Sequence, residues 1–332
     1  MLISVAVVAH NEEKTLPRLL ADLCAQDYPH DRMEILLIDS LSTDRTRSIM
    51  ERFAAEDHGF ASVLLLDNPR KILPCGCNVA LKHYIGDAIV RIDAHASVPA
   101  DFLTKNVRVL ESGEMVCGGQ RPNIIDEDSP WKQTLLTAEQ SMFGSSIASY
   151  RHSVKRQYVS SIFHGMYRRE VYDTVGLYNE NLARTEDNDM SWRIRQAGFR
   201  ICYDPEIISY QHTRSSLKTM LRQKYLNGYW IGKTMGVTPK CFSLFHFVPL
   251  CFVLGILLTG ILAAFGIWQL AALMWGAYAL LVFAISLLEM LRKPAAAKLA
   301  LPALFLLLHV SYGAGTLIGL AEMPFWLRKI KD

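Results

Sequence analysis

Short apolar runs alternate with amphipathic segments through the first hundred residues of the chain. Four aliphatic runs predict buried strands, at Ile3–Ala9, Ile35–Asp39, Val63–Leu66 and Ala88–Ile92. The segments between them predict helices, one with Pro17 in its first turns, one from Arg45 and one from about Cys75 to His83. Apolar strands that alternate with helices indicate an α/β fold, with a mainly parallel sheet and helices on both faces.

The last ninety or so residues follow a different pattern. No Asp, Glu, Lys or Arg occurs from Cys241 to Leu288 or from Leu299 to Ala321. A membrane-spanning helix needs about 20 apolar residues, so we expect three spans, near Leu244–Phe265, Leu270–Leu288 and Leu301–Leu320. Before them, Leu217–Met235 mixes large apolar side chains with lysine and arginine, which is typical of a helix lying in a membrane interface.

Charge separates along the same boundary. The 332 residues include 35 Lys+Arg and 32 Asp+Glu, and the segment from Cys241 onward, with six bases and three acids, carries the whole excess of +3. The soluble part therefore has no basic excess that would indicate a nucleic-acid partner. The seven scattered cysteines suit reduced cytosolic thiols, and the strand pattern at the N-terminus predicts no signal peptide.

The basic residues also predict an orientation. Arg292, Lys293 and Lys298 lie between the second and third predicted spans, and positive loops favour the cytoplasmic side. Two crossings would then leave the soluble domain in the cytoplasm as well. A third would carry Arg328–Lys331 outside, so either that segment is re-entrant or interfacial, or the rule is broken here.

Polar side chains gather at the carboxyl ends of the predicted strands, where ligands bind in open parallel sheets. They are Asn11, Asp39, Asp67 and Asp93. Asp93 and His95 could share one divalent cation that holds a diphosphate; alternatively, Asp93 caps a turn and His95 has no role. No glycine-rich phosphate loop occurs in the sequence, which favours a metal.

A second acidic group, Thr185–Asp189, precedes a predicted helix over Met190–Ala197. Acids at a helix N-terminus can simply complement its dipole, but a carboxylate held there could also accept a proton from a hydroxyl.

Taken together, these segments resemble the inverting family 2 glycosyltransferases, which have the GT-A fold. The matching pieces cover roughly residues 1–215 in the family's order: Ser4–Glu13, Ile38–Thr46, Asn78–Leu81, Gly86–Asp87 with Ile92–His95, and Glu186–Asp187. The resemblance implies a catalytic domain over 1–214, followed by an interfacial helix over 215–240 and a membrane domain over 241–332. It also implies a UDP-sugar donor.

The resemblance assigns roles to individual residues. The donor would be held by Ala9, Asn11, Glu12, Asp39, Lys71, Asn78 and Asp93. Asp187 would be the general base, and Glu186 would orient the acceptor. Asp93, His95 and His212 would bind the metal. Since His95 replaces the family's usual second acid, we expect Mn²⁺ to be preferred over Mg²⁺.

Arg91–Ala96 and several later segments also resemble a subgroup, the bacterial succinoglycan-type exopolysaccharide glucosyltransferases. This implies that a multi-pass protein of the bacterial inner membrane transfers one sugar to a lipid-diphosphate-linked oligosaccharide at the cytoplasmic face. The resemblance weakly favours UDP-glucose as the donor. The expected acceptor residues are Arg121, Arg151, Gln223, Tyr229 and Trp230.

Three alternatives stay open. A processive synthase is disfavoured because Leu226-Asn227 stands where its Arg-Trp pair would be, and a nucleotidyltransferase because Asn11-Glu12-Glu13 is acidic. A catalytically silent scaffold is disfavoured because it would not need the acids Asp39, Asp93, Glu186 and Asp187. Gly315–Gly319 could form a helix-packing face, either between copies in a homo-oligomer or within one chain.

Overall fold

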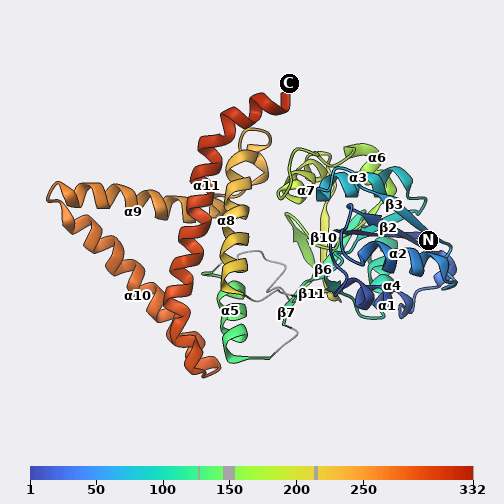
Figure 1. Ribbon diagram of the computed structural model, residues 1–332, viewed down its shortest axis with the longest axis horizontal. Helices are drawn as coiled ribbons and strands as arrows, with labels where there is room; N and C mark the ends of the chain where they lie inside the picture. The colour runs from blue at the N-terminus through green and yellow to red at the C-terminus, as the bar shows by residue number, and fades with distance from the viewer. Residues whose placement is uncertain (126–127, 145–153, 213–215, 332) are drawn as a thin grey trace. The chain divides into compact units, whose positions relative to one another are not determined.

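The computed structural model describes residues 1–125, 128–144, 154–212 and 216–331 (Figure 1). The chain forms two compact units, Met1–Pro122 with Ala148–His212, and Asn123–Ile147 with Thr213–Asp332. The sequence pattern had placed Asn123–Ile147 within the first domain, whereas the structure groups this segment with the C-terminal helices.

The first unit is built on a sheet that has eight strands in the described part of the chain, in the order β3-β2-β1-β4-β9-β6-β10-β8. The strands are β1 (Ile3–Ala9), β2 (Met33–Asp39), β3 (Ser62–Asp67), β4 (Ala88–Arg91), β6 (Val116–Gln120), β8 (Gln157–Val159), β9 (Met166–Arg168) and β10 (Ile201–Ile208). Neighbours pair in parallel except at β9, which is antiparallel to β4 and β6, and at β8, which is antiparallel to β10. The predicted α/β class with a mainly parallel sheet is confirmed.

Helices cover both faces of this sheet (Figure 1). They are α1 (Leu16–Cys24), α2 (Thr46–Ala55), α3 (Leu73–His83), α4 (Phe102–Glu111), α6 (Arg169–Val175) and α7 (Glu186–Gln196). Alternate residues of the strands enter two separate cores: Val5 and Val7 pack with α1, α2 and α4, and Ala6 packs with α3, α6 and α7. Both faces of the central strands are therefore apolar, which accounts for their continuous hydrophobic sequence.

Helix α7 starts earlier than its sequence pattern predicted. It runs from Glu186, so Glu186 and Asp187 form its first turn instead of preceding it. Three acids in a first turn complement the positive end of the helix dipole, and this stabilisation explains why the helix includes residues with little helical periodicity.

The second unit contains α5 (Pro130–Gln140), α8 (Leu217–Thr234), α9 (Val248–Ala264), α10 (Trp268–Arg292) and α11 (Leu301–Lys331). Among the described residues, three helical segments are long and apolar enough to cross a membrane: Leu244–Ala264, Trp268–Arg292 and Ala296–Ile330. Only 11% of the first two is buried, against 39% of the third. Helices α9 and α10 form a hairpin, whereas α11 packs along α8 (Figure 1).

Glycines make the close packing of α8 on α11 possible. A Cβ atom at Gly232 of α8 would collide with the backbone of Thr316, Gly319 and Leu320, and one at Gly319 would collide with the backbone of Tyr229. The small-residue face of α11 is thus occupied by α8 of the same chain, which is the second of the two readings predicted for Gly315–Gly319.

Gly232→Ala should destabilise the second unit by about 1–3 kcal/mol, because the added methyl group meets backbone atoms that cannot move aside. Gly260→Ala in α9 is the matched control, since nothing lies within 4 Å of the added atom. The melting temperature of the purified protein in detergent measures both. Equal effects of the two substitutions would contradict the close packing of α8 on α11.

Candidate active site

The carboxyl ends of β1, β2 and β3 form one level edge. Ala9, Asp39 and Asp67 are in register across the three strands, and the amide of Ser40 donates to the carbonyl of Ala9 at 2.9 Å. Residues in the left-handed backbone region follow each of the three strands, namely Asn11, Leu41 and Lys71 with φ of 57°, 55° and 62°. Such conformations are uncommon outside glycine and concentrate at functional sites.

Asn11 and Asp39 are fixed by the loop after β2, and Glu12 lies beside them with other partners. The Asn11 side chain accepts a hydrogen bond from the Thr43 amide at 2.8 Å, and Asp39 accepts one from the Ser42 amide at 3.2 Å. The Glu12 carboxylate accepts from the Thr15 hydroxyl at 2.6 Å and lies 3.5 Å from Nδ1 of His95. These predicted donor-binding residues therefore gather at one edge.

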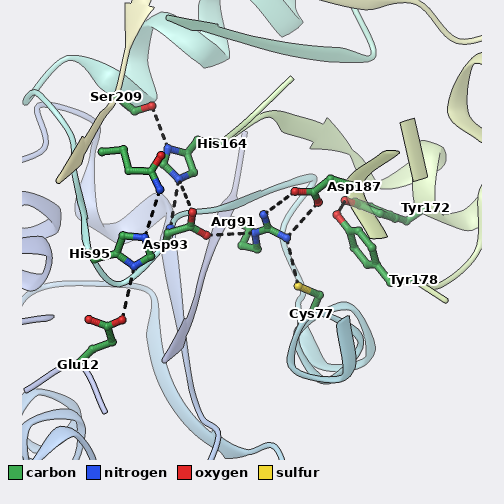
Figure 2. Close-up of polar contacts among 11 residues, drawn as sticks. Glu12, Cys77, Arg91, Asp93, His95, His164, Tyr172, Tyr178, Asp187 and Ser209 are labelled. Carbon is green, nitrogen blue, oxygen red and sulfur yellow. Dashed lines mark hydrogen bonds and ion pairs between the residues drawn. The ribbon is translucent and has the colours of Figure 1, made fainter. Parts of the chain in front are cut away.

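Asp93 lies just beyond β4, in a network of charged groups (Figure 2). Its Oδ2 is 3.4 Å from Nε2 of His164, and its Oδ1 is 3.6 Å from Nε of Arg91. Burial opposes ionisation of this carboxyl, but the His164 hydrogen bond and the Arg91 charge outweigh it and hold the pKa of Asp93 well below its usual range. Asp93 is therefore a permanent carboxylate.

His164 contacts Asp93 through its imidazole ring (Figure 2). Its side chain is buried, its Nδ1 is 2.9 Å from the Ser209 hydroxyl, and burial lowers the pKa of its imidazole. Its backbone φ is 45°, a strained conformation for a non-glycine residue. Sequence reasoning missed His164, because it stands alone in an apolar segment with no motif around it.

His95 is about one-third exposed, and its imidazole lies between Glu12 and Gln211, with Nε2 3.3 Å from Nε2 of Gln211 (Figure 2). Strand β11 (Tyr210–His212) pairs with β5 (Ala96–Ser97), so the His212 amide donates to the His95 carbonyl at 3.3 Å. The His212 imidazole, however, lies 3.0 Å from the Ser97 hydroxyl. The structure thus brings His212 close to His95 through its backbone.

Within the described residues, no three His, Cys, Asp or Glu side chains form a ready metal site. Asp93 and His95 nevertheless offer an ionised carboxylate and an imidazole on the same short loop. Mg²⁺ and similar ions commonly bind one or two protein ligands and complete their shell with substrate phosphates and water. These two donors fit a divalent cation that arrives with a diphosphate.

Asp187 is held by Arg91, the last residue of β4 (Figure 2). The guanidinium donates from Nη1 to Oδ1 at 3.2 Å and from Nη2 to Oδ2 at 3.0 Å, which is a bidentate pair. Sequence reasoning predicted Asp187 but not this partner. Arg91 and Asp187 are 96 positions apart, so no local sequence pattern connects them.

Glu186 is buried beside Asp187, and within the described part of the chain its Oε2 has no hydrogen-bond partner. Burial and the neighbouring Asp187 charge raise the pKa of Glu186 to about 8. At neutral pH this residue is largely a neutral acid and can therefore donate a hydrogen bond.

The remaining predicted residues lie elsewhere or are already engaged. Asn78 uses its amide on the backbone of Tyr178, at 2.8 Å and 2.9 Å, and Lys71 is exposed. Buried Arg121 stacks on Phe163, with 3.9 Å from its guanidinium carbon to the ring centre. Arg151 lies outside the described residues.

The three acceptor residues predicted on α8 belong to the second unit. Gln223 is exposed, Tyr229 hydrogen-bonds Glu322, and Trp230 meets Trp326 edge to face at 6.0 Å. Lys233 lies 4.4 Å above the Tyr229 ring. These contacts do not test a role in acceptor binding, so the three assignments stay predictions.

The profile of the family described as glycosyl transferase family 2 matches residues 4–176. This chain belongs to that family and is a glycosyltransferase with the GT-A fold.

Two relatives cover much of the chain. It is 26% identical over 322 residues to the dolichyl N-acetyl-alpha-D-glucosaminyl phosphate 3-beta-D-2,3-diacetamido-2,3-dideoxy-beta-D-glucuronosyltransferase of Methanococcus voltae, which covers 94% of this chain and 95% of that protein. It is 28% identical over 204 residues to the succinoglycan biosynthesis protein ExoA of Rhizobium meliloti, covering 60% of this chain and 59% of that one.

A solved structure shares the fold. The mannosyltransferase PcManGT from Pyrobaculum calidifontis, solved in complex with GDP-Man and Mn²⁺, aligns with a TM-score of 0.59 at 19% identity, covering 94% of this chain and 86% of that chain.

Glu186→Gln should stabilise the protein increasingly as the pH rises. The pKa of Glu186 is higher in the folded state, about 8 against 4.5, so the unfolded chain ionises first and wild-type stability falls between these two values. Glutamine cannot ionise, so at neutral pH the free energy of unfolding of the variant should exceed that of the wild type by at least about 1 kcal/mol. Below pH 4.5 the two should not differ on this account.

Thermal melts from pH 4.5 to pH 8 test this. Glu206→Gln is the control, because Glu206 is exposed and its pKa is lowered by a hydrogen bond from Arg108, so its removal should slightly destabilise at higher pH. A Glu186→Gln gain that does not change with pH would contradict the assigned charge state.

Proposed function

We propose that this enzyme transfers one sugar, with inversion, from a UDP-sugar to a lipid-linked glycan at the cytoplasmic face of the inner membrane. The observation that carries the proposal is the pairing of two carboxylates, Asp93 and Asp187, around the single guanidinium of Arg91. Asp93 suits a divalent cation that binds the donor diphosphate, and Asp187 suits an acceptor hydroxyl.

The donor would bind at the edge formed by β1, β2 and β4. Ala9, Asn11, Glu12 and Asp39 lie along this edge, with Lys71 on the exposed loop after β3 and Asn78 farther along the chain on α3. The complex of the similar fold with GDP-Man and Mn²⁺ supports a nucleotide-sugar donor and a divalent cation. UDP and a preference for Mn²⁺ are our proposals, the latter because an imidazole ligand suits Mn²⁺ better than Mg²⁺.

Asp93 and His95 would hold the divalent cation, with His212 as a further candidate. When bound, that cation neutralises charge that develops on the departing diphosphate. Asp187 would take the proton of the acceptor hydroxyl, because its carboxylate retains lone pairs that Arg91 does not occupy. Glu186, largely neutral, would donate a hydrogen bond that orients the acceptor.

The lipid-linked acceptor is supported by the relatives and by the second unit. The name of the Methanococcus voltae protein contains dolichyl N-acetyl-alpha-D-glucosaminyl phosphate, and a relative from Pseudomonas syringae is named undecaprenyl-phosphate 4-deoxy-4-formamido-L-arabinose transferase. We propose that the apolar helices α9–α11 anchor the chain in the membrane in which such a lipid resides.

Membranes that contain the enzyme, incubated with radiolabelled UDP-glucose, UDP-N-acetylglucosamine or GDP-mannose and with lipid extract, should transfer label into the lipid fraction from a UDP-sugar. Asp187→Asn should reduce this transfer roughly 10²–10⁴-fold, the usual contribution of a general base, while UDP binding changes little. Release of free sugar without lipid labelling would contradict the acceptor, and full turnover of Asp187→Asn would contradict the base.

His95→Ala should weaken Mn²⁺-dependent UDP binding by about 10–100-fold, a loss typical of a perturbed metal site. In EDTA, wild type and variant should bind UDP equally. Titration calorimetry with Mn²⁺, with Mg²⁺ and with EDTA measures this directly, and His83→Ala, an exposed histidine on α3, is the control. If His95→Ala binds UDP like wild type under all three conditions, His95 is not a metal ligand.

A further inference from the structure

We propose that Arg91 is a positioning residue that fixes the general base Asp187 in relation to the donor-side carboxylate Asp93. This inference rests on the proposed function, because it requires Asp187 to act as the base. Arg91 itself touches neither the donor nor the acceptor in this proposal; it acts through the two carboxylates beside it (Figure 2).

The backbone of Arg91 is held in place by pairing of β4 with strands on both sides. It is the last residue of β4, where its backbone is in register with Ala6 of β1, and the next amide, of Ile92, donates to the Ala6 carbonyl at 3.0 Å. On the other side, the preceding residue Val90 pairs with Met166 of β9. The guanidinium thus extends from a strand that is held on both edges in the middle of the sheet.

Asp187, in contrast, depends on Arg91. It lies in the first turn of α7, and within the described residues both of its carboxylate oxygens are hydrogen-bonded by Arg91 alone. A planar fork fixes the plane of a carboxylate as well as its distance, which a lysine ammonium cannot do. The plane determines where the remaining lone pairs of Asp187 face the acceptor.

The charges around Arg91 favour this role over simple neutralisation of one acid. Its Nε lies 3.6 Å from Asp93 Oδ1, so the same guanidinium also faces the second carboxylate. The sulfur of Cys77, 3.6 Å from Nη1, stays a neutral thiol because burial raises the pKa of Cys77 to about 12. Among the contacts of the described residues, this mostly buried cation therefore connects the two carboxylates.

A buried ion pair is in general weak support for stability, since apolar replacements often fold as well. An arginine with only a structural role would, when replaced, change stability and donor binding together. A positioning residue would change turnover while donor binding persists. These outcomes can be separated by measurement.

Arg91→Lys should lower kcat roughly 10-fold and Arg91→Met roughly 10²-fold, the range expected when a reacting group is misplaced by about 1 Å. The KM for the UDP-sugar and the affinity for UDP with Mn²⁺ should change less than about threefold in both variants. Methylguanidinium should restore about tenfold of the turnover that Arg91→Ala loses, and methylammonium should not, because only the former supplies the fork.

Arg169→Met is the matched control. Arg169 donates to the backbone carbonyls of Tyr84 and Gly86 and stacks on the Tyr84 ring, with no contact to Asp187. Its replacement should lower the melting temperature but leave kcat of the folded enzyme unchanged.

Three results would overturn the proposal: Arg91→Met turning over within threefold of wild type, rescue by methylammonium as good as by methylguanidinium, or an equal kcat loss in Arg169→Met. Asp187→Asn distinguishes this failure from failure of the proposed function. If Asp187→Asn is inactive while Arg91→Met is active, only the role of Arg91 is wrong; if Asp187→Asn is fully active, the base assignment itself is wrong.

Discussion

The pairing of the mostly buried Arg91 guanidinium with Asp93 and Asp187 is the interaction on which the site depends. A guanidinium cannot lose its proton in a protein, so burying it requires anionic partners, and the two carboxylates satisfy that requirement at 3.0 Å and 3.6 Å. The surroundings of Asp93 and Glu186 give these two acids different protonation states. Asp93 stays ionised, whereas Glu186, beside Asp187 but without a cation of its own, keeps its proton.

The sheet makes this arrangement possible. Strand β4 lies between β1 and the antiparallel β9, so Arg91 extends from the most constrained part of the first unit. Residues of the loops, by contrast, are fixed by hydrogen bonds across neighbouring strand ends, such as that from the Thr43 amide to Asn11. Strained conformations at Asn11, Lys71 and His164 persist because the surrounding contacts hold them.

The second unit follows different physical rules. Its helices α9 and α10 expose most of their apolar surface, whereas α8 and α11 pack so closely that only glycine fits at several contacts. Small residues of this kind allow backbones to approach where apolar burial gives little driving force. The amphipathic sequence of α8 therefore reflects two demands, a small-residue face for α11 and longer polar and aromatic side chains elsewhere.

Local sequence patterns were enough to predict the first four strands of the sheet and the edge at which the polar site residues gather. β1 was predicted with its observed bounds, and Asp39 and Asp93 were placed at the sheet edge, because strand periodicity and the rule for parallel sheets act locally. The side-chain partners of these residues became known only from the fold. Four contacts join residues that no local pattern connects: Arg91 with Asp187, His164 with Asp93, Asn78 with Tyr178, and Gly319 with α8. Side-chain partners depend on how separate elements pack, and that information is absent from any one segment.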